Sequence, residues 1–435
     1  MNIKIKKADH PLSGTLSFPG DKSLSHRAII FGALAEGESH FTNVLTAEDC
    51  VCTRKAFEAL GVEIRSNGST GLTIKGRGLH ALKSPAHEIY LGNSGTAMRL
   101  LMGVLAGNPL EALLTGDPSL SSRPMRRVTD YLKRMGASFE GKDNANFAPI
   151  KVKGGKLKAI DAKLGIPSAQ VKSAILLAGL YAQGKTSVTE PAKSRDHTER
   201  FLKYFGARIE EKGLTVSIRG GQRLKAGSFE IAGDISSAAF FMAMALLVPA
   251  SGITFESILD NPTRTGIIEA LGKMGAHFGN KRRRAQEGPE NVSNFSLKAQ
   301  PLKAFEIRKA QIPSLIDEIP ILSVMATQAN GTSVIYDADE LRVKETDRIH
   351  SMVTQLSNMG AKIRSEGNTI IIDGPTALTG AEVDSFKDHR TAMSLIVAGL
   401  LADGETRVRD LDCIYTSFPN FFELLKKAGA RYELY

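Results

Sequence analysis

Tryptophan is absent from this chain of 435 residues, and only three cysteines occur, at positions 50, 52 and 413. Three cysteines are too few for a disulfide framework, and Cys50 and Cys52 have no histidine or further cysteine at metal-ligand spacing. The longest apolar stretches, residues 238–249 and 392–402, fall short of the roughly 18 residues that a membrane span requires. We therefore expect neither a disulfide scaffold, nor a structural zinc site, nor a transmembrane helix.

The composition is that of an ordinary globular protein, with 42% hydrophobic and 23% charged residues. At roughly 100–200 residues per domain, the length predicts two or three domains. The first residues are basic but lack the apolar run of a signal peptide and the Ser/Arg-rich character of a transit peptide. We therefore expect a soluble, cytoplasmic protein.

The chain has fewer acidic than basic residues, with 46 Asp and Glu against 56 Lys and Arg, which gives a net charge of +10. Such a balance favours an anionic partner, either nucleic acid or a phosphorylated metabolite. The one obvious basic run, residues 281–284, carries no interleaved aromatic side chains that could stack on bases. We interpret it as a solvated hairpin loop, and nucleic acid is the less favoured partner.

Internal repetition is the strongest signal in the sequence. Six segments share an apolar helical run, a turn with glycine and the start of a β-branched strand, and their turn glycines stand at positions 37, 107, 184, 252, 331 and 404. A second set of amphipathic segments ends in a glycine C-cap followed by a short strand, for example at residues 57–64 and 422–432. Each repeat thus predicts two helices and short strands such as 72–75 and 369–373, which indicates an α/β fold with repeats grouped three and three.

The first helix of each repeat is apolar on nearly all faces and is predicted to be buried, whereas the second should cover the outside. Polar residues precede the buried helices, and they include the cations Lys22, Arg27 and Arg390. Simple capping explains serine, threonine, asparagine and aspartate, but cations oppose the helix dipole at this end. Cations at these positions indicate that an anion binds among them.

Residues 179–186 match the P-loop pattern, which cradles phosphate only where the loop follows a strand and opens a helix. Here the predicted order is reversed, with an apolar helix before the loop and a strand after it. We interpret the match as a turn that ends a helix.

Several motifs together resemble those of the 5-enolpyruvylshikimate-3-phosphate synthase family. They span essentially the whole chain, in the order residues 20–27, 91–99, 122–125, 167–174, 341–348 and 388–394. The resemblance implies transfer of the enolpyruvyl group of phosphoenolpyruvate to the 5-hydroxyl of shikimate 3-phosphate, with release of phosphate through a tetrahedral intermediate. The pathway would be the shikimate route to chorismate and the aromatic amino acids, and glyphosate would be an inhibitor.

The resemblance also implies the two-domain enolpyruvyl transferase fold, an inside-out α/β barrel of six βαβαββ repeats, three in each domain. Residues 21–232 would form the N-terminal domain, on the shikimate 3-phosphate side, and residues 1–20 and 233–435 the C-terminal domain. The active site would lie in the cleft between the domains.

The family's site residues carry over motif by motif. The resemblance assigns catalysis to Asp317, Glu345 and Lys22, and shikimate 3-phosphate binding to Lys22, Ser23, Arg27, Ser168, Ala169, Gln170, Arg195, Asp317 and Lys344. It assigns phosphoenolpyruvate binding to Lys22, Asn93, Gly95, Arg123, Gln170, Arg348 and Arg390. It implies a monomer whose partners are its two small-molecule substrates, with no cofactor, no metal, no nucleic acid and no membrane.

Two positions depart from the pattern of many relatives. Thr416 stands before the Phe418–Pro419 pair, where those relatives carry a lysine that binds phosphoenolpyruvate, and Ala169 replaces the second serine of a pair. We expect a less cationic phosphoenolpyruvate subsite and one hydroxyl fewer on shikimate 3-phosphate.

Two other functions remain in competition at this point. The enolpyruvyl transferase that acts on UDP-N-acetylglucosamine shares the fold but relies on a cysteine in a mobile loop, and residues 114–123 contain none. A basic nucleic-acid-binding repeat protein, the less favoured alternative, would need stacking aromatics that we do not find.

Overall fold

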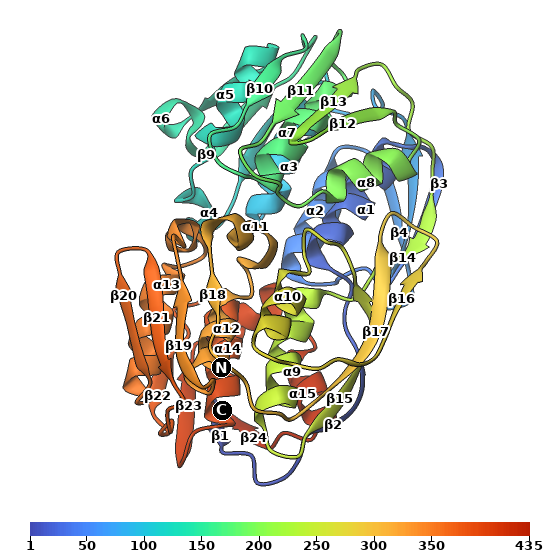
Figure 1. The fold of residues 1–435 in the computed structure, drawn as a ribbon. Coiled ribbons are helices and arrows are strands. Elements are labelled where there is room, and N and C mark those ends of the chain that lie inside the picture. Colours follow the sequence, from blue (N-terminus) through green and yellow to red (C-terminus); the bar gives the residue numbers. More distant parts are fainter. The chain divides into compact units, whose positions relative to one another are not determined.

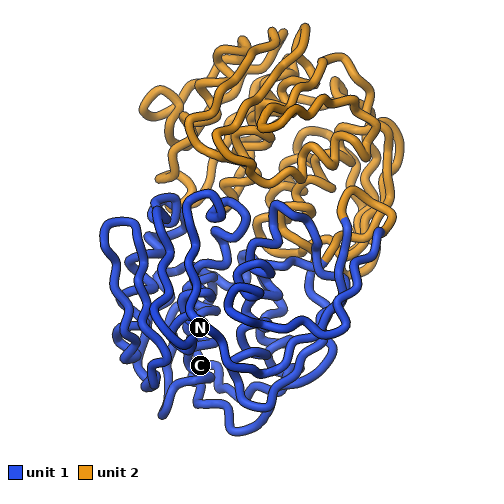
Figure 2. Tube along the Cα trace, in the orientation of Figure 1, with its two compact units in different colours: residues 1–19, 233–285, 291–435 blue, residues 20–232, 286–290 orange.

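The six repeats divide three and three between two units of the chain (Figure 2). In the computed structural model, which describes residues 1–435, unit 1 consists of residues 1–19, 233–285 and 291–435. Unit 2 consists of residues 20–232 and 286–290. The chain therefore passes between the units at residues 19–20 and 232–233, and residues 286–290 are a further short excursion into unit 2.

Unit 2 holds the blue-to-green elements of Figure 1. Its helices are α1 (Lys22–Leu34), α2 (Glu48–Ala59), α3 (Gly95–Ala106), α4 (Pro118–Ser121), α5 (Arg126–Met135), α6 (Lys142–Ala145), α7 (Ala169–Gly179) and α8 (His197–Tyr204). Its strands are β3 (Glu36–Thr42), β4 (Glu63–Asn67), β5 (Gly71–Arg77), β6 (Ile89–Tyr90), β7 (Glu111–Thr115), β8 (Ser138–Gly141), β9 (Phe147–Lys153), β10 (Asp161–Lys163), β11 (Lys185–Thr189), β12 (Ile209–Lys212), β13 (Thr215–Arg219) and β14 (Ser228–Glu230).

Unit 1 contains both ends of the chain. Its strands are β1 (Ile3–Lys6), β2 (Ser13–Ser17), β15 (Gly252–Leu259), β16 (Gly279–Ala285), β17 (Asn291–Lys298), β18 (Glu306–Ile307), β19 (Gly331–Ile335), β20 (Lys362–Glu366), β21 (Thr369–Gly374), β22 (Glu382–Asp384), β23 (Glu405–Arg409) and β24 (Tyr432–Leu434). Its helices are α9 (Ile235–Leu247), α10 (Gly266–Lys273), α11 (Ile312–Leu315), α12 (Ile319–Thr327), α13 (Arg348–Asn358), α14 (His389–Gly399) and α15 (Phe421–Lys427), with 3-10 turns η1 (Lys309–Gln311), η2 (Asp339–Val343) and η3 (Leu411–Thr416).

Every repeat forms a four-stranded sheet of one topology. In unit 2 the strand orders are β14-β3-β5-β4, β6-β7-β9-β8 and β10-β11-β13-β12, and in unit 1 they are β2-β15-β17-β16, β18-β19-β21-β20 and β22-β23-β1-β24. In each sheet the first pair is parallel and the other two pairs are antiparallel. The last sheet closes on the start of the chain, because β1 pairs with both β23 and β24, and the two ends of the chain meet there (Figure 1).

The predicted division between buried and covering helices is confirmed. The first helices of the repeats, which are α1, α3, α7, α9, α12 and α14, are buried over most of their length; residues 235–246 of α9 are all buried. The second helices bury one face only, as α5 does with Val128, Leu132 and Met135. The first backbone N–H groups of a buried helix need hydrogen-bond acceptors, and the residue before the helix can supply one.

Five of the six buried helices are capped by the side chain of their own N-cap residue. Asp21, Ser94, Ser168, Asp234 and Asp388 accept hydrogen bonds from backbone N–H groups of α1, α3, α7, α9 and α14, respectively. Helix α12 is the exception, since its N-cap residue, Glu318, makes no such bond. The capping prediction is thus confirmed for five repeats.

Helices α3 and α7 lie against each other in unit 2. A Cβ atom at Gly103 of α3 would lie only 2.3 Å from the backbone oxygen of Ala174 in α7, so any side chain there would force the two helices apart. This close approach brings the N-terminus of α7 beside that of α3, where predicted site residues from both helices stand.

Two local predictions have different outcomes. The P-loop match lies between the end of α7 at Gly179 and the start of β11 at Lys185, so the predicted order of helix before strand is confirmed. The interpretation of residues 281–284 as a loop is wrong, because they form the middle of β16, an edge strand whose residues are all exposed. Backbone pairing with β17 makes this segment a strand, which its charged side chains do not indicate.

No helix of the chain combines the length and the apolar character that crossing a membrane would require.

Candidate functional site

The predicted site residues of unit 1 come from the starts of three helices. Asp317 precedes α12, Arg348 is the first residue of α13, and Arg390 is the second residue of α14. Lys344 and Glu345 lie in the short link between η2 and α13. Because the starts of α12, α13 and α14 lie together, residues distant in sequence form one network.

Arg348 is the centre of this network and is only 1% exposed. Its Nε donates to Oδ2 of Asp388 at 2.7 Å, its Nη2 donates to Oε2 of Glu345 at 2.7 Å, and its Nη1 donates to Oδ1 of Asp317 at 3.4 Å. Burial by itself lowers the pKa of a guanidinium, but the charges of Asp388, Glu345 and Asp317 outweigh it and raise the pKa of Arg348 above its ordinary value. Arg348 is therefore a permanent cation that orients three carboxylates.

Arg390 approaches Asp317 from α14. Its Nη1 donates to the backbone oxygen of Asp317 at 3.1 Å, and its Nε lies 3.6 Å from Oδ1 of the same residue. The carboxylate of Asp317 thus lies between two guanidinium groups, and its side chain is 15% exposed. The side chain of Glu345 is 25% exposed. Each of the two carboxylates therefore contacts a buried cation and is also accessible from outside.

In unit 2 a second network surrounds the N-terminus of α3. Arg123 donates through Nη2 to Oδ1 of Asn93 and through Nη1 to the backbone oxygen of Asn93 at 3.3 Å. Asn93 in turn donates through Nδ2 to Asp117 at 2.7 Å. These contacts fix an arginine and an amide beside the first turn of α3, which begins at Gly95.

Gln170 connects α7 to the same turn. Its Nε2 donates to Thr96 Oγ1 at 2.9 Å, and its Oε1 accepts from Arg99 Nη1 at 2.7 Å. A Cβ atom at Gly95 would lie 2.8 Å from Arg99 Nη1 and 3.5 Å from Arg123 Nη1. The structure therefore brings together Asn93, Gly95, Arg123 and Gln170, four residues that the sequence assigned to phosphoenolpyruvate.

Arg27 is deeply buried within unit 2, with 3% exposure. Its guanidinium donates to the backbone oxygen of Ser23 at 2.9 Å, to Ser173 Oγ at 2.9 Å and to Thr198 Oγ1 at 2.8 Å. Burial is the main reason that the pKa of Arg27 is lowered to about 10; the charges of Glu199 and Asp21 oppose this shift, and the nearby charge of Arg195 contributes to it. Arg27 still carries a full charge at neutral pH, and it shares its surroundings with Ser23 and Arg195.

Three further predicted residues lie at helix starts in unit 2. Lys22, the first residue of α1, forms an ion pair with Asp49 at 3.1 Å. Ser168 caps α7 by accepting from the N–H of Val171 at 3.4 Å, and Ala169 is the first residue of that helix. Lys344 of unit 1 is partly buried beside Glu345.

The departure at position 416 is structural as well as chemical. Thr416 ends η3, and its hydroxyl donates to the backbone oxygen of Cys413 at 2.7 Å. The side chain is therefore engaged with its own turn and brings no charge to the site.

Sequence reasoning missed the partners that hold the predicted residues in place. Asp388, Ser173 and Arg99 stood inside the quoted motifs, and their polar or charged nature was a usable signal. Asp49 and Thr198 carried no such signal, because their partners are far away in sequence.

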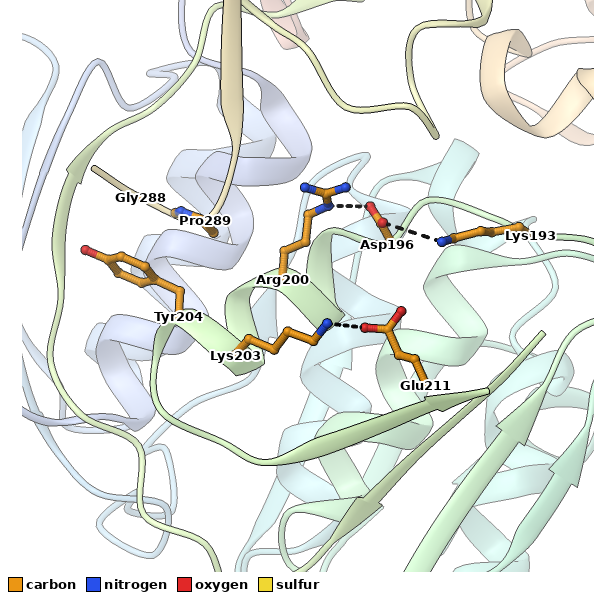
Figure 3. A pocket seen from close by; sticks show the side chains of 8 residues that line it. All are labelled: Lys193, Asp196, Arg200, Lys203, Tyr204, Glu211, Gly288 and Pro289. Carbon is orange, nitrogen blue, oxygen red and sulfur yellow. Dashed lines mark hydrogen bonds and ion pairs between the residues drawn. The ribbon is translucent and has the colours of Figure 1, made fainter. Parts of the chain in front are cut away.

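A hollow of about 570 Å³ on unit 2 is separate from these networks (Figure 3). Its cations are matched by carboxylates, since Arg200 pairs with Asp196 at 2.9 Å and Lys203 pairs with Glu211 at 2.5 Å. Figure 3 shows these pairs along its wall, and its lining contains Lys193, Asp196, Arg200, Lys203, Tyr204, Glu211, Gly288 and Pro289. None of these is a predicted site residue.

Behind this hollow, Asp196, His197 and Glu290 bring three potential metal-binding atoms within 4.8 Å of one another. Arg200 donates to Asp196 and lies 3.6 Å from Glu290, so one guanidinium contacts both carboxylates. His197 Nδ1 lies 2.6 Å from Glu290 Oε1. This arrangement is a buried ion-pair cluster, and it suits a guanidinium rather than a metal ion.

Comparison with known proteins places these networks in context. The model of the family "EPSP synthase (3-phosphoshikimate 1-carboxyvinyltransferase)" matches residues 6–425. A 3-phosphoshikimate 1-carboxyvinyltransferase of Desulforamulus reducens is 50% identical over 416 residues, covering 96% of this chain and 97% of the relative. One of Brevibacillus brevis is 47% identical over 425 residues, covering 98% and 99%. The EPSP synthase structure from Acinetobacter baumannii has a TM-score of 0.89 at 42% identity, covering 99% of each chain. The predicted two-domain enolpyruvyl transferase fold class is confirmed by this similarity.

Proposed function

The chain belongs to the EPSP synthase family, which transfers the enolpyruvyl group of phosphoenolpyruvate to shikimate 3-phosphate, and we propose that Asp317 and Glu345 carry the proton transfers of this reaction. The enzyme is thus a transferase of the shikimate pathway. The alternative acceptor, UDP-N-acetylglucosamine, is not favoured.

The reaction needs two proton movements. The 5-hydroxyl of shikimate 3-phosphate loses a proton as its oxygen attacks C2 of phosphoenolpyruvate, while the methylene carbon gains one. The tetrahedral intermediate then loses a proton from the new methyl group and expels phosphate, which restores the double bond. Two carboxylates in different surroundings suit these opposite tasks.

The observation that carries this proposal is the shared contact of Asp317 and Glu345 with one buried cation, Arg348. Arg390 also approaches Asp317, so the two carboxylates share one buried cation while Asp317 has a second guanidinium beside it. This difference in surroundings suits two carboxylates with opposite proton-transfer tasks. We propose that Asp317 accepts the hydroxyl proton and that Glu345 protonates the carbon and later reclaims a proton.

Arg348 and Arg390 are proposed to bind the anionic groups of phosphoenolpyruvate from unit 1, with Lys344 near shikimate 3-phosphate. A planar guanidinium suits both carboxylate and phosphate, because it can donate two parallel hydrogen bonds. In unit 2, Asn93, Gly95, Arg123 and Gln170 are proposed to bind phosphoenolpyruvate. The contact between Asn93 and Arg123 supports this assignment, since it holds two donors in a fixed orientation.

Ser23, Arg27, Ser168, Ala169, Gln170 and Arg195 are proposed to hold shikimate 3-phosphate in unit 2. Arg27 would act mainly by its charge and by fixing Ser23, because its donors already serve Ser23, Ser173 and Thr198. Lys22 is proposed to stabilise the negative charge that develops in the transition state. We further propose that residues 21–232, and residues 1–20 with 233–435, act as two domains on one pair of substrates.

We propose that the enzyme functions as a monomer in the cytoplasm, without nucleic acid or membrane as a partner. The three free cysteines suit a reducing compartment. Light scattering coupled to size-exclusion chromatography tests the monomer.

The decisive assay measures release of inorganic phosphate from phosphoenolpyruvate with either shikimate 3-phosphate or UDP-N-acetylglucosamine as acceptor. We expect phosphate release only when shikimate 3-phosphate is the acceptor.

A binding experiment tests the proposed site. Arg195→Ala should weaken shikimate 3-phosphate binding in calorimetry, because a charge-assisted contact to phosphate is lost. An unchanged dissociation constant would remove Arg195 from the proposed site. Arg208→Ala, at an exposed position, is the matched control.

A further inference from the structure

Helix α12 begins differently from the other five buried helices. Its N-cap residue Glu318 is completely buried, yet its side chain does not cap its own helix. The need for a cap is reduced, because Pro320 in the first turn has no N–H and a turn of helix α11 runs directly into this segment. A buried carboxylate requires partners, so the side chain of Glu318 must serve another element.

That element is the N-terminus of α9. Ser236 Oγ donates a hydrogen bond to Oε1 of Glu318 and accepts one from Arg264 Nη2 at 2.9 Å. Arg264 Nη2 also lies 3.3 Å from Oδ1 of Asp234, the N-cap residue of α9. Ser236 and Arg264 are each 2% exposed, so the whole relay is shielded from water. In this relay a hydroxyl connects a buried carboxylate to a buried guanidinium.

The relay is anchored one residue away from Asp317. The backbone oxygen of Asp317 accepts from Arg390 Nη1 at 3.1 Å, and the N–H of Glu318 in the same peptide unit donates to the backbone oxygen of Leu315 at 2.9 Å. The side chain of Glu318 accepts a hydrogen bond from Ser236 and so connects this segment to α9. The backbone that carries Asp317 is therefore fixed at its carbonyl, at its amide and through the next side chain.

We propose that Glu318 is a positioning residue, which acts through Ser236 and Arg264 to hold Asp317 at the reacting hydroxyl. This inference rests on the proposed role of Asp317 as proton acceptor. A general base must lie within about 2.6–3.2 Å of its proton donor, and a displacement of about 1 Å can cost on the order of 100-fold in rate. The other repeats provide a comparison. In each of the other five buried helices, the N-cap side chain accepts a hydrogen bond from a backbone N–H of its own helix, whereas the side chain of Glu318 does not.

The test compares Glu318→Ala with Glu318→Gln in steady-state kinetics. Glu318→Ala should lower kcat about 10- to 100-fold, with the KM for phosphoenolpyruvate unchanged within about twofold, because the base is displaced while binding of this substrate continues. Glu318→Gln should recover most of the loss, because its amide oxygen can still accept from Ser236. If Glu318→Gln is as slow as Glu318→Ala, the positioning role is wrong.

Ser323→Ala separates positioning from loss of stability. Ser323 is buried in the same helix and donates to the backbone oxygen of Ile319 at 2.9 Å, so its hydrogen bond stays within the helix and does not involve Ser236 or Arg264. We expect Ser323→Ala to lower the melting temperature without changing kcat. If it lowers kcat as much as Glu318→Ala, both act through stability and the proposal fails.

Ser236→Ala provides a second route should Glu318→Ala fail to fold. It removes the same relay, so it should lower kcat in the same direction, and the double variant should be no slower than the worse single variant. Asp317→Asn is measured alongside. Normal turnover in Asp317→Asn would refute the proposed base and with it the relay. An inactive Asp317→Asn together with normal Glu318→Ala and Ser236→Ala would refute the relay alone.

Discussion

Arg348 and Asp388 form an ion pair of 2.7 Å in which the two side chains are only 1% and 0% exposed. Asp388 performs two tasks at once, because its Oδ1 also accepts from the N–H groups of Arg390 at 2.7 Å and Thr391 at 3.4 Å. The same carboxylate therefore caps α14 and aligns the arginine that contacts Asp317 and Glu345. Capping and site assembly are coupled through one residue.

This coupling predicts different losses for two substitutions of Asp388. Both substitutions break the buried ion pair, at about 3–5 kcal/mol. Asp388→Asn can keep the cap through its one amide oxygen, whereas Asp388→Ala also loses the cap, at about 1 kcal/mol more. Urea unfolding should therefore show a clearly larger loss for the alanine variant. Ser94→Ala, which removes only the cap of α3, should lose about 1 kcal/mol. Equal stability of the two Asp388 variants would contradict the double role.

Glu345→Gln is expected to lower kcat by about 10²–10⁴-fold, because it removes a proton-transfer group but preserves the shape of the side chain. Shikimate 3-phosphate should still bind, as calorimetry can verify. Glu366→Gln is the matched control, since Glu366 is an exposed residue that pairs with Arg364. Turnover like that of the unmodified enzyme in Glu345→Gln would refute the assigned role.

Gly95→Ala is expected to reduce sensitivity to glyphosate and to raise the KM for phosphoenolpyruvate. The added methyl group would lie 2.8 Å from Arg99 Nη1, so Arg99 and its partner Gln170 must shift. Inhibition curves for both proteins test this prediction. Gly155→Ala, where an added methyl group meets open space, should leave the curve unchanged. If Gly95→Ala also leaves it unchanged, Gly95 does not border the phosphoenolpyruvate subsite.

His26 predicts a pH dependence of stability. Burial, aided by the charges of Lys22 and Arg27, lowers the pKa of His26 from 6.5 to about 3, and its Nδ1 lies 2.7 Å from Thr53 Oγ1. The unfolded chain therefore binds a proton at this residue between pH 6.5 and 3 while the folded chain does not, so stability falls as the pH falls through this window.

The contribution of His26 amounts to about 2 kcal/mol between pH 7 and pH 5. Urea unfolding at both pH values should show a smaller loss on acidification for His26→Asn than for the unmodified protein. His87→Asn, at an exposed position, is the control and should behave like the unmodified protein. Equal pH dependence in His26→Asn would show that His26 is not the titrating group.

Much of the architecture follows from local sequence patterns. The apolar runs predicted six buried helices, the amphipathic segments predicted six covering helices, and the polar residues before the runs predicted the caps at Asp21, Ser94, Ser168, Asp234 and Asp388. These features depend on side-chain periodicity and on hydrogen bonds between residues a few positions apart, so they can be predicted from short segments of the sequence. The motifs likewise indicated which residues to consider for the site.

Tertiary structure decided which of those residues meet. Arg348 contacts the carboxylates of Asp317 and Asp388, and the side chain of Glu318 contacts Ser236 of another helix, because the fold brings together helix starts that are 31 to 82 positions apart in the chain. The basic run at 281–284 is a strand only because β17 pairs with its backbone, which no property of its side chains indicates. Sequence thus determined the elements and the candidate chemistry, whereas long-range burial and charge pairing determined the partners, since these energies exist only when distant segments are packed together.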